Sequence, residues 1–235
     1  MKLTRVGSIY QIAFMPKIFP INCYFVEEED GLTLIDTGMS FCVKGIVTAA
    51  MEIGKPIARI VLTHAHDDHV LGLDSLRELY PDVPVYLSKR DTRLLDGDRS
   101  LDADEPDSPI KGGVPKNVKT RPDILLVDGD QIGSLVAIST PGHTPGSISF
   151  FDMRCKGIIA GDAFQTKGGL AVSGKLNLFF PFPAMATWNK ELAVESAKKI
   201  RELKPTLLAV GHGEMIKDPV VRMDRAIEEA LKTIK

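Results

Sequence analysis

The sequence predicts an α/β fold in which β-sheets are covered by helices. Short runs rich in β-branched and aromatic residues, which are typical of strands, fill the first 36 residues. Beyond them, strand-like apolar runs alternate with segments whose apolar residues recur at the helical spacing. The alternation occurs in both halves of the 235-residue chain. Elements in this order bury their apolar faces by stacking helices on sheets.

The first half of the chain carries a regular order of strands and helices. We expect its strands over residues 21–26, 32–35, 59–62 and 83–87. Ser40 can cap a helix that runs to about Ile53, where Gly54 is a typical C-terminal stop. A second helix is expected over about 70–80, between two of the strands.

The second half repeats that order around two irregular segments. Residues 96–120 lack periodicity and predict a long loop or cap, and residues 164–186 are also irregular. Strands are expected over residues 124–127, 135–140, 147–151, 157–160 and 206–210. Thr187 is the predicted cap of a helix that ends near Leu203. Asp218 is the predicted cap of the last helix, because a proline follows at the first helical position.

Composition and charge limit the class of protein. Apolar residues make up 44% of the chain and no linker or repeat divides it, so we expect one domain over 1–235. The formal net charge is −2 without an extended basic tract, so no nucleic-acid partner is expected. The lack of a leader-like or membrane-length apolar run predicts a cytoplasmic protein without a membrane partner. Three widely spaced cysteines fit reduced, packed thiols.

All five histidines occupy positions that are typical of metal ligands. Three of them lie within six residues, in the H-x-H-x-D-H run of His64, His66, Asp68 and His69. Imidazole and carboxylate are the groups that hold zinc and iron in proteins. Four such donors cannot all reach one tetrahedral ion without strain, but they can serve two neighbouring ions. Exposed loop histidines and a helix N-cap at Asp68 are the ordinary alternatives, and Asp67 fits a solvated or capping residue.

Two more histidines and one aspartate share this context. His143 lies in the segment T-P-G-H-T-P-G, and His212 lies in G-H-G, each beside a glycine at the end of an apolar run. Asp162 ends the predicted strand over 157–160. Alone, a strand-end aspartate usually forms a turn. Together with the first cluster, these residues predict a metal site at the carboxyl ends of several strands, where loops converge.

The order of these motifs resembles that of the metallo-β-lactamase superfamily. H-x-H-x-D-H is followed by T-P-G-H-T-P-G-S, then G-D and then G-H-G, and the resemblance extends from Asp36 to His212. It implies a four-layer αββα sandwich, in which two mixed sheets are flanked by helices. It also implies that the metal ions lie at one edge, between the two sheets.

By residue match, the resemblance implies a ligand set for two Zn²⁺ ions, with iron or manganese as alternatives. The first ion would be held by His64, His66 and His143. The second ion would be held by Asp68, His69 and His212. Asp162 would bridge the two ions. Asp36 matches an aspartate that accepts the second N–H of a ligating imidazole, although a turn at a strand end is its ordinary alternative.

The implied reaction is hydrolysis of an ester, thioester or lactone of a small molecule. Two divalent cations roughly 3.5–4 Å apart share a water and bring its pKa near neutrality, which gives a hydroxide at pH 7. Asp68 would orient this nucleophile and pass on its proton, so Asp68 and Asp36 are the predicted catalytic residues. The sequence has no G-x-S-x-G motif for a serine nucleophile.

Other activities stay open. A persulfide dioxygenase of the superfamily uses a similar ligand pattern with one iron, and a nuclease or phosphodiesterase would cleave a phosphate ester. Asp162 stands where one large class of true β-lactamases has cysteine, which favours the glyoxalase II, lactonase and nuclease branches. Only 23 residues follow His212, so the helical extension with which glyoxalase II binds glutathione is not expected. Outside enzymes, the alternative is a domain that keeps metals for folding or partner binding.

Three variable segments are expected to select the substrate, namely residues 10–20, 96–120 and 164–186. Their large apolar side chains could form a wall for an acyl or ring group. These side chains are Phe14, Met15, Phe19, Phe179, Phe180 and Phe182. They could instead cover the core or a homodimer interface. Lys167 and Lys175 could contact an anionic substrate, although solvated loop lysines are the ordinary interpretation.

Overall fold

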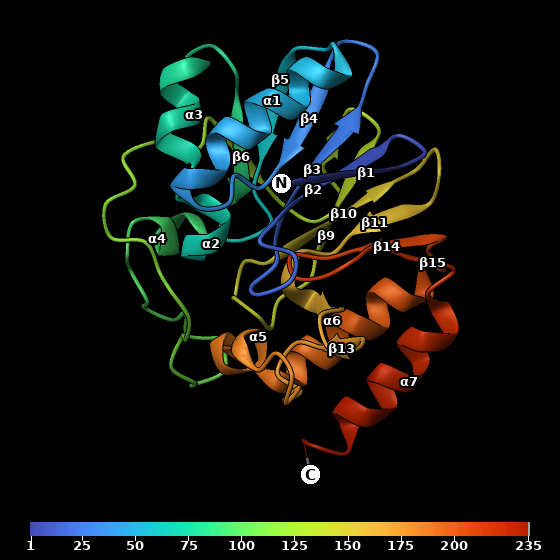
Figure 1. Cartoon of the computed structure of the whole chain (residues 1–235). Coiled ribbons are helices and arrows are strands. Elements are labelled where there is room, and N and C mark those ends of the chain that lie inside the picture. The colour runs from blue at the N-terminus through green and yellow to red at the C-terminus, as the bar shows by residue number, and fades with distance from the viewer. Residues whose placement is uncertain (235) are drawn as a thin grey trace.

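Two mixed β-sheets form the centre of the computed structural model, which describes residues 1–234 (Figure 1). Sheet A contains seven strands in chain order: β1 (Lys2–Val6), β2 (Ile9–Phe14), β3 (Ile21–Glu27), β4 (Leu32–Ile35), β5 (Ile57–Val61), β6 (Val85–Ser88) and β7 (Ile124–Leu126). The first four strands form an antiparallel meander, and β4 to β7 are parallel. The carboxyl ends of the parallel strands therefore meet at one edge.

Sheet B contains six strands in the order β15-β14-β11-β10-β9-β8. Their bounds are β8 (Gln131–Ile132), β9 (Leu135–Ser139), β10 (Ile148–Asp152), β11 (Gly157–Ile159), β14 (Leu207–Ala209) and β15 (Ile216–Lys217). Strands β11 and β14 are parallel, and the other neighbours are antiparallel. Within the second irregular segment lie a two-stranded sheet of β12 (Phe164–Gln165) and β13 (Ala171–Val172) and a short helix, α5 (Phe182–Ala186).

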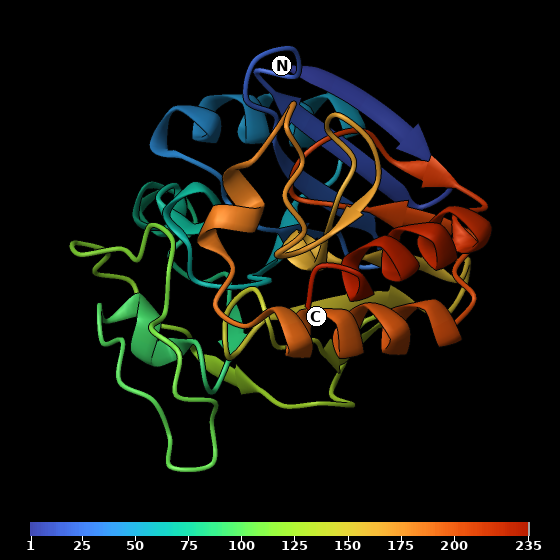
Figure 2. The same ribbon diagram turned by 90° about the horizontal axis from the view of Figure 1, so that it is seen from below.

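Helices cover the outer faces of both sheets. The first half supplies η1 (Ser40–Cys42), α1 (Val43–Ile53), α2 (Asp67–Val70), α3 (Leu73–Leu79) and α4 (Thr92–Leu95) on sheet A. The second half supplies η2 (Gly161–Ala163), and it places α6 (Lys190–Glu202) and α7 (Val220–Leu231) on sheet B. Figure 2 shows α6 and α7 side by side over this sheet.

Three separate apolar clusters fill the spaces between four layers. Alternate residues of β3 divide between two of them, because successive side chains of a strand point to opposite faces. Cys23 and Phe25 pack with the helices on sheet A, whereas Tyr24 and Val26 pack between the two sheets. The third cluster joins sheet B to α6 and α7. The expected four-layer αββα sandwich, with two mixed sheets flanked by helices, is thereby confirmed.

Two of the predicted helix starts are displaced along the chain. Ser40 lies in the 3₁₀ turn η1 before α1, and its hydroxyl donates to the carbonyl of Leu71 instead of capping the helix. The predicted stop at Gly54 is confirmed, with a φ of +78°. At α6 the cap is Asn189, whose side chain accepts from the backbone N–H of Leu192.

Two further differences concern α7 and the helix predicted over 70–80. Pro219 occupies the cap position of α7 without a side-chain cap, and Asp218 before it has a φ of +47°. The helix over 70–80 is divided into α2 and α3 around Gly72. A Cβ at Gly72 would lie 2.4 Å from the carbonyl oxygen of Thr37, so the chain needs glycine at this close approach.

The structure bears on two composition-based expectations. No helix within residues 1–234 is both long and apolar enough to cross a lipid bilayer. The three cysteines are free: Cys23 and Cys42 are buried, and Cys155 is partly exposed. One domain over residues 1–235, a homodimer and a cytoplasmic location stay predictions.

Candidate metal centre

The seven predicted ligands lie together at one edge of the molecule, where loops from both sheets meet. Sheet A supplies the loop after β5 and helix α2, and sheet B supplies the turns after β9, β11 and β14. The ligand atoms form three groups, each with all of its atoms within 4.8 Å of one another. The groups are His64, His66 and His143; His64, His69 and Asp162; and Asp68, His69 and His212. Every residue predicted as a ligand is therefore part of one cluster.

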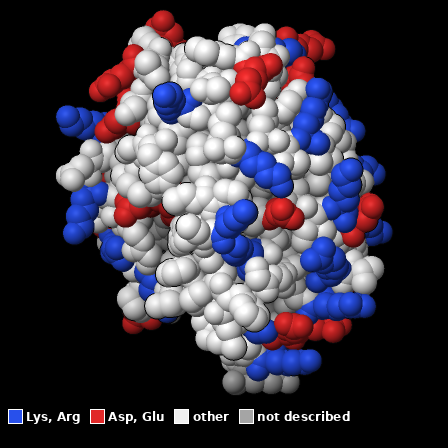
Figure 3. Space-filling view, in the orientation of Figure 1, with Lys and Arg blue, Asp and Glu red and all other residues white. Residues whose placement is uncertain are grey.

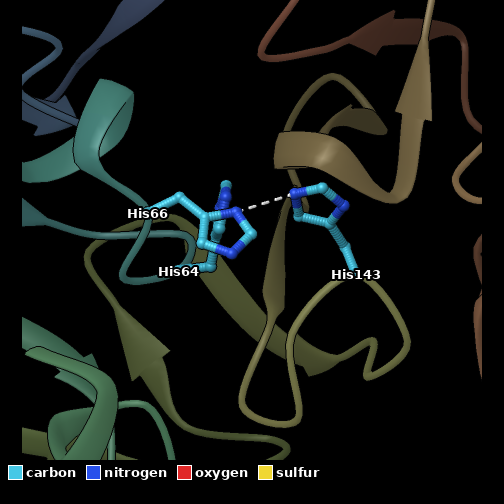
Figure 4. A group of neighbouring side chains, drawn as sticks. All are labelled: His64, His66 and His143. Atoms are coloured by element: carbon cyan, nitrogen blue, oxygen red, sulfur yellow. Dashed lines mark hydrogen bonds between the residues drawn. The ribbon is translucent and has the colours of Figure 1, made fainter. Parts of the chain in front are cut away.

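Three histidines form the first half of the site (Figure 4). His64 and His66 follow strand β5, and His143 lies between β9 and β10. The Nδ1 atom of His66 and the Nε2 atom of His143 face each other at 3.0 Å. The Nε2 atom of His64 is buried without a hydrogen-bond partner in the described part of the chain. Leaving a buried polar atom unpaired is costly, so this cluster fits a bound cation.

Asp68, His69 and His212 form the second half. One carboxylate oxygen of Asp68 lies 3.4 Å from Nε2 of His212, and the other lies 3.9 Å from Nε2 of His69. Both histidines are buried, and Nε2 of His69 has no hydrogen-bond partner among residues 1–234. The Asp68 side chain is 25% exposed and lines a cavity. A small molecule in that cavity can therefore reach this carboxylate.

Asp162 lies between the two halves. Its Oδ2 atom is 3.3 Å from Nε2 of His143 and 3.1 Å from Nε2 of His212. Its Oδ1 atom is 3.6 Å from Nε2 of His69 and lacks a hydrogen-bond partner within residues 1–234. Gly211 makes room for this carboxylate, because a Cβ there would lie 2.1 Å from Oδ1. Contact with both halves is the arrangement that a bridging ligand requires.

Each imidazole is held from outside through the ring nitrogen that faces away from the cluster. The contacts of 2.6–3.0 Å join His64 Nδ1 to Thr63 Oγ1, His66 Nε2 to the Lys111 carbonyl, His69 Nδ1 to Asp36 Oδ2, His143 Nδ1 to Ser173 Oγ and His212 Nδ1 to the Pro20 carbonyl. Carbonyl and carboxylate oxygens only accept, so the outer nitrogens of His66, His69 and His212 carry the proton. Their inner nitrogens then face the cluster, which is how a ligating imidazole is oriented.

Burial and charge divide the histidines into two classes. Burial lowers the pKa of His64, His66 and His143, to about 3 for His143. Burial also opposes the charged form of His69, but three carboxylates, of which Asp36 has the largest effect, raise the pKa of His69 to about 10. The first half therefore offers neutral imidazoles, whereas His69 binds a proton that a metal ion must displace.

Asp36 acts on the site through one histidine. It is buried after β4 and has a φ of +61°, a conformation that aspartate adopts more readily than most residues. Its carboxylate accepts from the backbone N–H and the hydroxyl of Thr63, both at 2.8 Å, and from Nδ1–H of His69 at 2.7 Å. Asp36 does not line the cavity. Its contact with the ligand cluster runs through His69, which it orients, and its catalytic role stays a prediction.

A comparison with known protein families agrees with this geometry. Residues 16–212 match the profile of the Metallo-beta-lactamase superfamily. The chain belongs to this superfamily. The matched region contains Asp36 and all seven ligand candidates, so the resemblance inferred from the motifs is confirmed.

Several relatives have similar sequences. YobT of Bacillus subtilis (strain 168) is 53% identical over 232 residues, which cover 99% of this chain and 100% of YobT. The probable metallo-hydrolase YflN of the same organism is 33% identical over 82% of this chain and 80% of its own length. A hydroxyacylglutathione hydrolase of Bartonella tribocorum is 29% identical over 60% of this chain and 47% of its own length. These relatives support a metal-dependent hydrolase.

Solved structures share the metallo-β-lactamase fold. The BLEG-1 B3 metallo-beta-lactamase has a TM-score of 0.68 and 25% identity, with 92% of this chain and 96% of that chain covered. TTHA1623 in a di-iron-bound form has a TM-score of 0.65 and 26% identity, with coverage of 89% and 95%. The two neighbours cover nearly the whole superfamily domain of this chain.

The sequence predictions missed Asp91, a buried residue. It joins the loop that carries His64 and His66 to the loop that carries His143. Its carboxylate accepts from the backbone N–H of Ala65, inside the H-x-H motif, at 3.0 Å. It also accepts from the hydroxyl of Thr144 and the N–H of Gly146, both at 2.8 Å and both after His143. Asp91 follows strand β6, and an acidic residue after a strand is the same signal that identifies the aspartate ligands.

The first irregular segment, which is expected from the sequence to select the substrate, also contacts the ligands themselves. Residues 96–120 contain no helix or strand, as predicted. At Gly112, where φ is +86°, a Cβ would lie 2.4 Å from Nε2 of His66. The guanidinium of Arg99 donates to the carbonyl of Gly112 at 3.0 Å. The carbonyl of Gly113 accepts from the first backbone N–H of α2 at 2.8 Å, so this segment is fixed against the ligand loop.

A cavity of about 470 Å³ adjoins the ligands of this metallo-β-lactamase fold. Its apolar walls include Met15, Phe19, Ile21, Phe41, Phe182 and Met185. Three of the six predicted wall residues, Met15, Phe19 and Phe182, therefore line the cavity. The other three do not: Phe14 is buried in the core on sheet A, Phe180 packs against Phe19, and Phe179 is 84% exposed.

Proposed function

We propose that the chain is a hydrolase that binds two divalent cations, most simply Zn²⁺, and cleaves an ester, thioester or lactone of a small molecule. The contact of Asp162 with both halves of the ligand cluster is the observation that carries the proposal. A carboxylate between two groups of imidazoles fits a pair of ions better than a single one.

The relatives agree with this proposal at a coarser level. The hydroxyacylglutathione hydrolase of Bartonella tribocorum acts, by its name, on an acylated glutathione, which is a thioester. The printed title of TTHA1623 reports two irons in that protein, so iron is the first alternative metal for this chain. Histidine and carboxylate donors accept zinc, iron and manganese alike.

The residues of the chain divide the tasks of such a reaction. When bound, two divalent cations would lower the pKa of a shared water and polarise the bond under attack. His64, His66 and His143 would hold one ion, and His69 and His212 would take part in holding the other. The inner nitrogens of these imidazoles face the site because each outer nitrogen is already bonded, and the proton on His69 would be displaced by the metal.

Asp68 is the proposed proton acceptor. Burial raises the pKa of its carboxyl, but the neighbouring imidazoles of His69 and His212 lower it further, so Asp68 stays ionised. Its side chain lines the cavity, where a carboxylate can orient a water and accept its proton. Apolar side chains form the rest of the cavity wall.

The test uses the variants His64→Ala and Asp162→Ala. Each should lose bound metal and at least about 100-fold in kcat/KM for a generic ester, because each removes an inward-facing ligand. Elemental analysis, ester hydrolysis and circular dichroism measure metal, activity and folding. Asp104→Ala is the matched control, since Asp104 is exposed and its side chain makes no hydrogen bond or ion pair with other residues of 1–234.

Retention of both metal and activity in the two ligand variants would contradict the proposed site. Oxygen uptake with a persulfide and one iron per chain would instead support the dioxygenase alternative. Cleavage of RNA or of a phosphodiester, with no turnover of carboxylic esters, would support the nuclease alternative.

A further inference from the structure

We infer that the substrate presents an uncharged, apolar acyl group to the cavity, and that the side chains at the cavity mouth select against an anionic one. The inference rests on the proposed hydrolase function and narrows its substrate class. It follows from three observations: the charge of the cavity lining, the partners of the nearby cations, and the exposed apolar side chains at the mouth.

The charged part of the lining is acidic. Asp67, Asp68 and Asp162 line the cavity, and no lysine or arginine does so among residues 1–234. Bound metal ions would offset the charges of Asp68 and Asp162, but a carboxylate or phosphate at the far end of the acyl group, away from the ions, would meet no lysine or arginine of the lining. Loss of water from such a group without a compensating bond is unfavourable.

Three cations of the segments expected to select the substrate are engaged elsewhere, whereas Lys17 and Lys111 are exposed and do not line the cavity. The guanidinium of Arg99 donates to the carbonyls of Ile110 and Gly112. The Lys167 ammonium donates to backbone carbonyls of the loop between β2 and β3. Lys175 pairs with Glu229 on α7 at 3.0 Å. The two lysines that the sequence offered for an anionic substrate are therefore used within the protein.

Large apolar side chains remain exposed where the cavity opens. Met15, Phe41, Phe182 and Met185 line it and are 42%, 54%, 51% and 66% exposed. Figure 3 shows a mostly uncharged surface in the region where Figure 1 places α5, which carries two of them. Exposed apolar groups that gather around a cavity are typical of a binding site. Here they can cover an acyl chain that extends beyond the ligands.

The first experiment compares p-nitrophenyl esters of increasing chain length, from acetate to octanoate, with the metal-loaded protein. If the walls bind the acyl chain, kcat/KM should rise roughly two- to fourfold for each added CH₂ until the cavity is filled. Turnover of the acetate ester reports the hydrolase itself. The slope with chain length reports the apolar site.

The second experiment compares two esters of nearly equal shape, the 5-methylhexanoate and the hemiglutarate. The 5-methylhexanoyl group ends in an isopropyl group, where the hemiglutaryl group ends in a carboxylate. The neutral ester should be preferred by roughly ten- to a hundredfold, because the carboxylate would be desolvated without a partner.

A charge introduced at the mouth should shift this preference. In Met185→Lys, the ratio of hemiglutarate to 5-methylhexanoate turnover should rise at least about tenfold, because the new ammonium can pair with the carboxylate. Met51→Lys is the matched control: Met51 is 75% exposed on α1 and does not line the cavity. Its ratio should equal that of the unchanged protein.

The outcomes distinguish failure of the apolar acyl site from failure of the proposed hydrolase function. Turnover of the acetate ester with a flat chain-length series, or with a preference for the hemiglutarate, would overturn the apolar site and leave the hydrolase. An equal shift in Met185→Lys and Met51→Lys would also contradict selection at the mouth. If no ester is turned over, the proposed hydrolase function is contradicted, and so is the inference that rests on it.

Discussion

Asp91 is a residue that can shape the metal site without contacting a ligand atom. Its carboxylate holds the loop of His64 and His66 to the loop of His143 through three donors. In Asp91→Ala, these donors lose their acceptor in a buried place, and each costs about 1–3 kcal/mol. We expect the free energy of unfolding to fall by several kcal/mol, as measured by urea denaturation.

The conservative variant separates positioning by Asp91 from a purely structural role. Asp91→Asn keeps one carbonyl oxygen and should recover part of the stability. Metal affinity should fall in both variants, because the two ligand loops are no longer held together. Metal affinity equal to that of the unchanged protein, alongside a clear loss of stability, would contradict the positioning role.

Residue types identified the ligands, and the resemblance pointed to Asp36 as a group that orients one of them, but the other orienting groups were not predicted. Histidines and aspartates after strands are visible in the sequence, and all seven lie in one cluster. The partners of His66 and His212 are backbone carbonyls of Lys111 and Pro20, which any residue could supply. Since a carbonyl carries no residue signature, only the fold reveals these contacts.

Among the chain's elements, the irregular segment over 96–120 has a direct role at the site. We predict that Gly112→Ala weakens metal binding and hydrolysis by roughly tenfold or more, because its Cβ would lie 2.4 Å from the ring of His66. Metal titration and ester kinetics measure the two effects. The bond from His66 to the Lys111 carbonyl should be lost as the loop moves away.

Gly97→Ala is the matched control for this prediction. Gly97 lies in the same segment with a φ of +81°, close to the +86° of Gly112, so both variants carry a similar backbone cost. The contact recorded for a Cβ at Gly97 is an ordinary 3.4 Å to a backbone oxygen. Equal losses of metal affinity in the two variants would mean that backbone strain, and not the ring of His66, is responsible.

Periodicity located most helices and strands, but side-chain chemistry misplaced several ends. Ser40 and Thr187 have the hydroxyls that caps require, yet both hydroxyls are used elsewhere. The Ser40 hydroxyl donates to the Leu71 carbonyl. The Thr187 hydroxyl donates to the Pro183 carbonyl, and its oxygen lies 3.3 Å from Nδ1 of His143. A polar residue near a helix start is therefore an ambiguous signal when the same loop also serves a binding site.

For the molecule as a whole, the ligands join loops of both sheets, in addition to the apolar cluster and the hydrogen bonds that connect the sheets. Removal of metal by a chelator should therefore lower the thermal midpoint. At a free metal concentration of about 100 times Kd, the bound metal contributes about 2.7 kcal/mol to stability. Calorimetry before and after chelation, and again after zinc or iron is restored, measures this effect. An unchanged midpoint would contradict metal binding by the folded state.

The fold class could be predicted from periodicity, whereas the number of layers and the pairing of distant strands could not. Alternating strands and helices indicated sheets under helical cover, but the four layers came from the resemblance of the motifs. The parallel pairing of β11 with β14 joins segments that are separated by the irregular segment over 164–186 and by α6. Local periodicity carries no information about such a partner.

The spread of the ligands over both sheets has a consequence for how the protein matures. A nascent chain holds the H-x-H-x-D-H run long before His212 is synthesised, and that run alone supplies neither triad completely. Ions captured early would be held weakly and could exchange with the cellular pool. Stable uptake must await completion of the C-terminal half, so the choice of metal is made by a nearly finished protein.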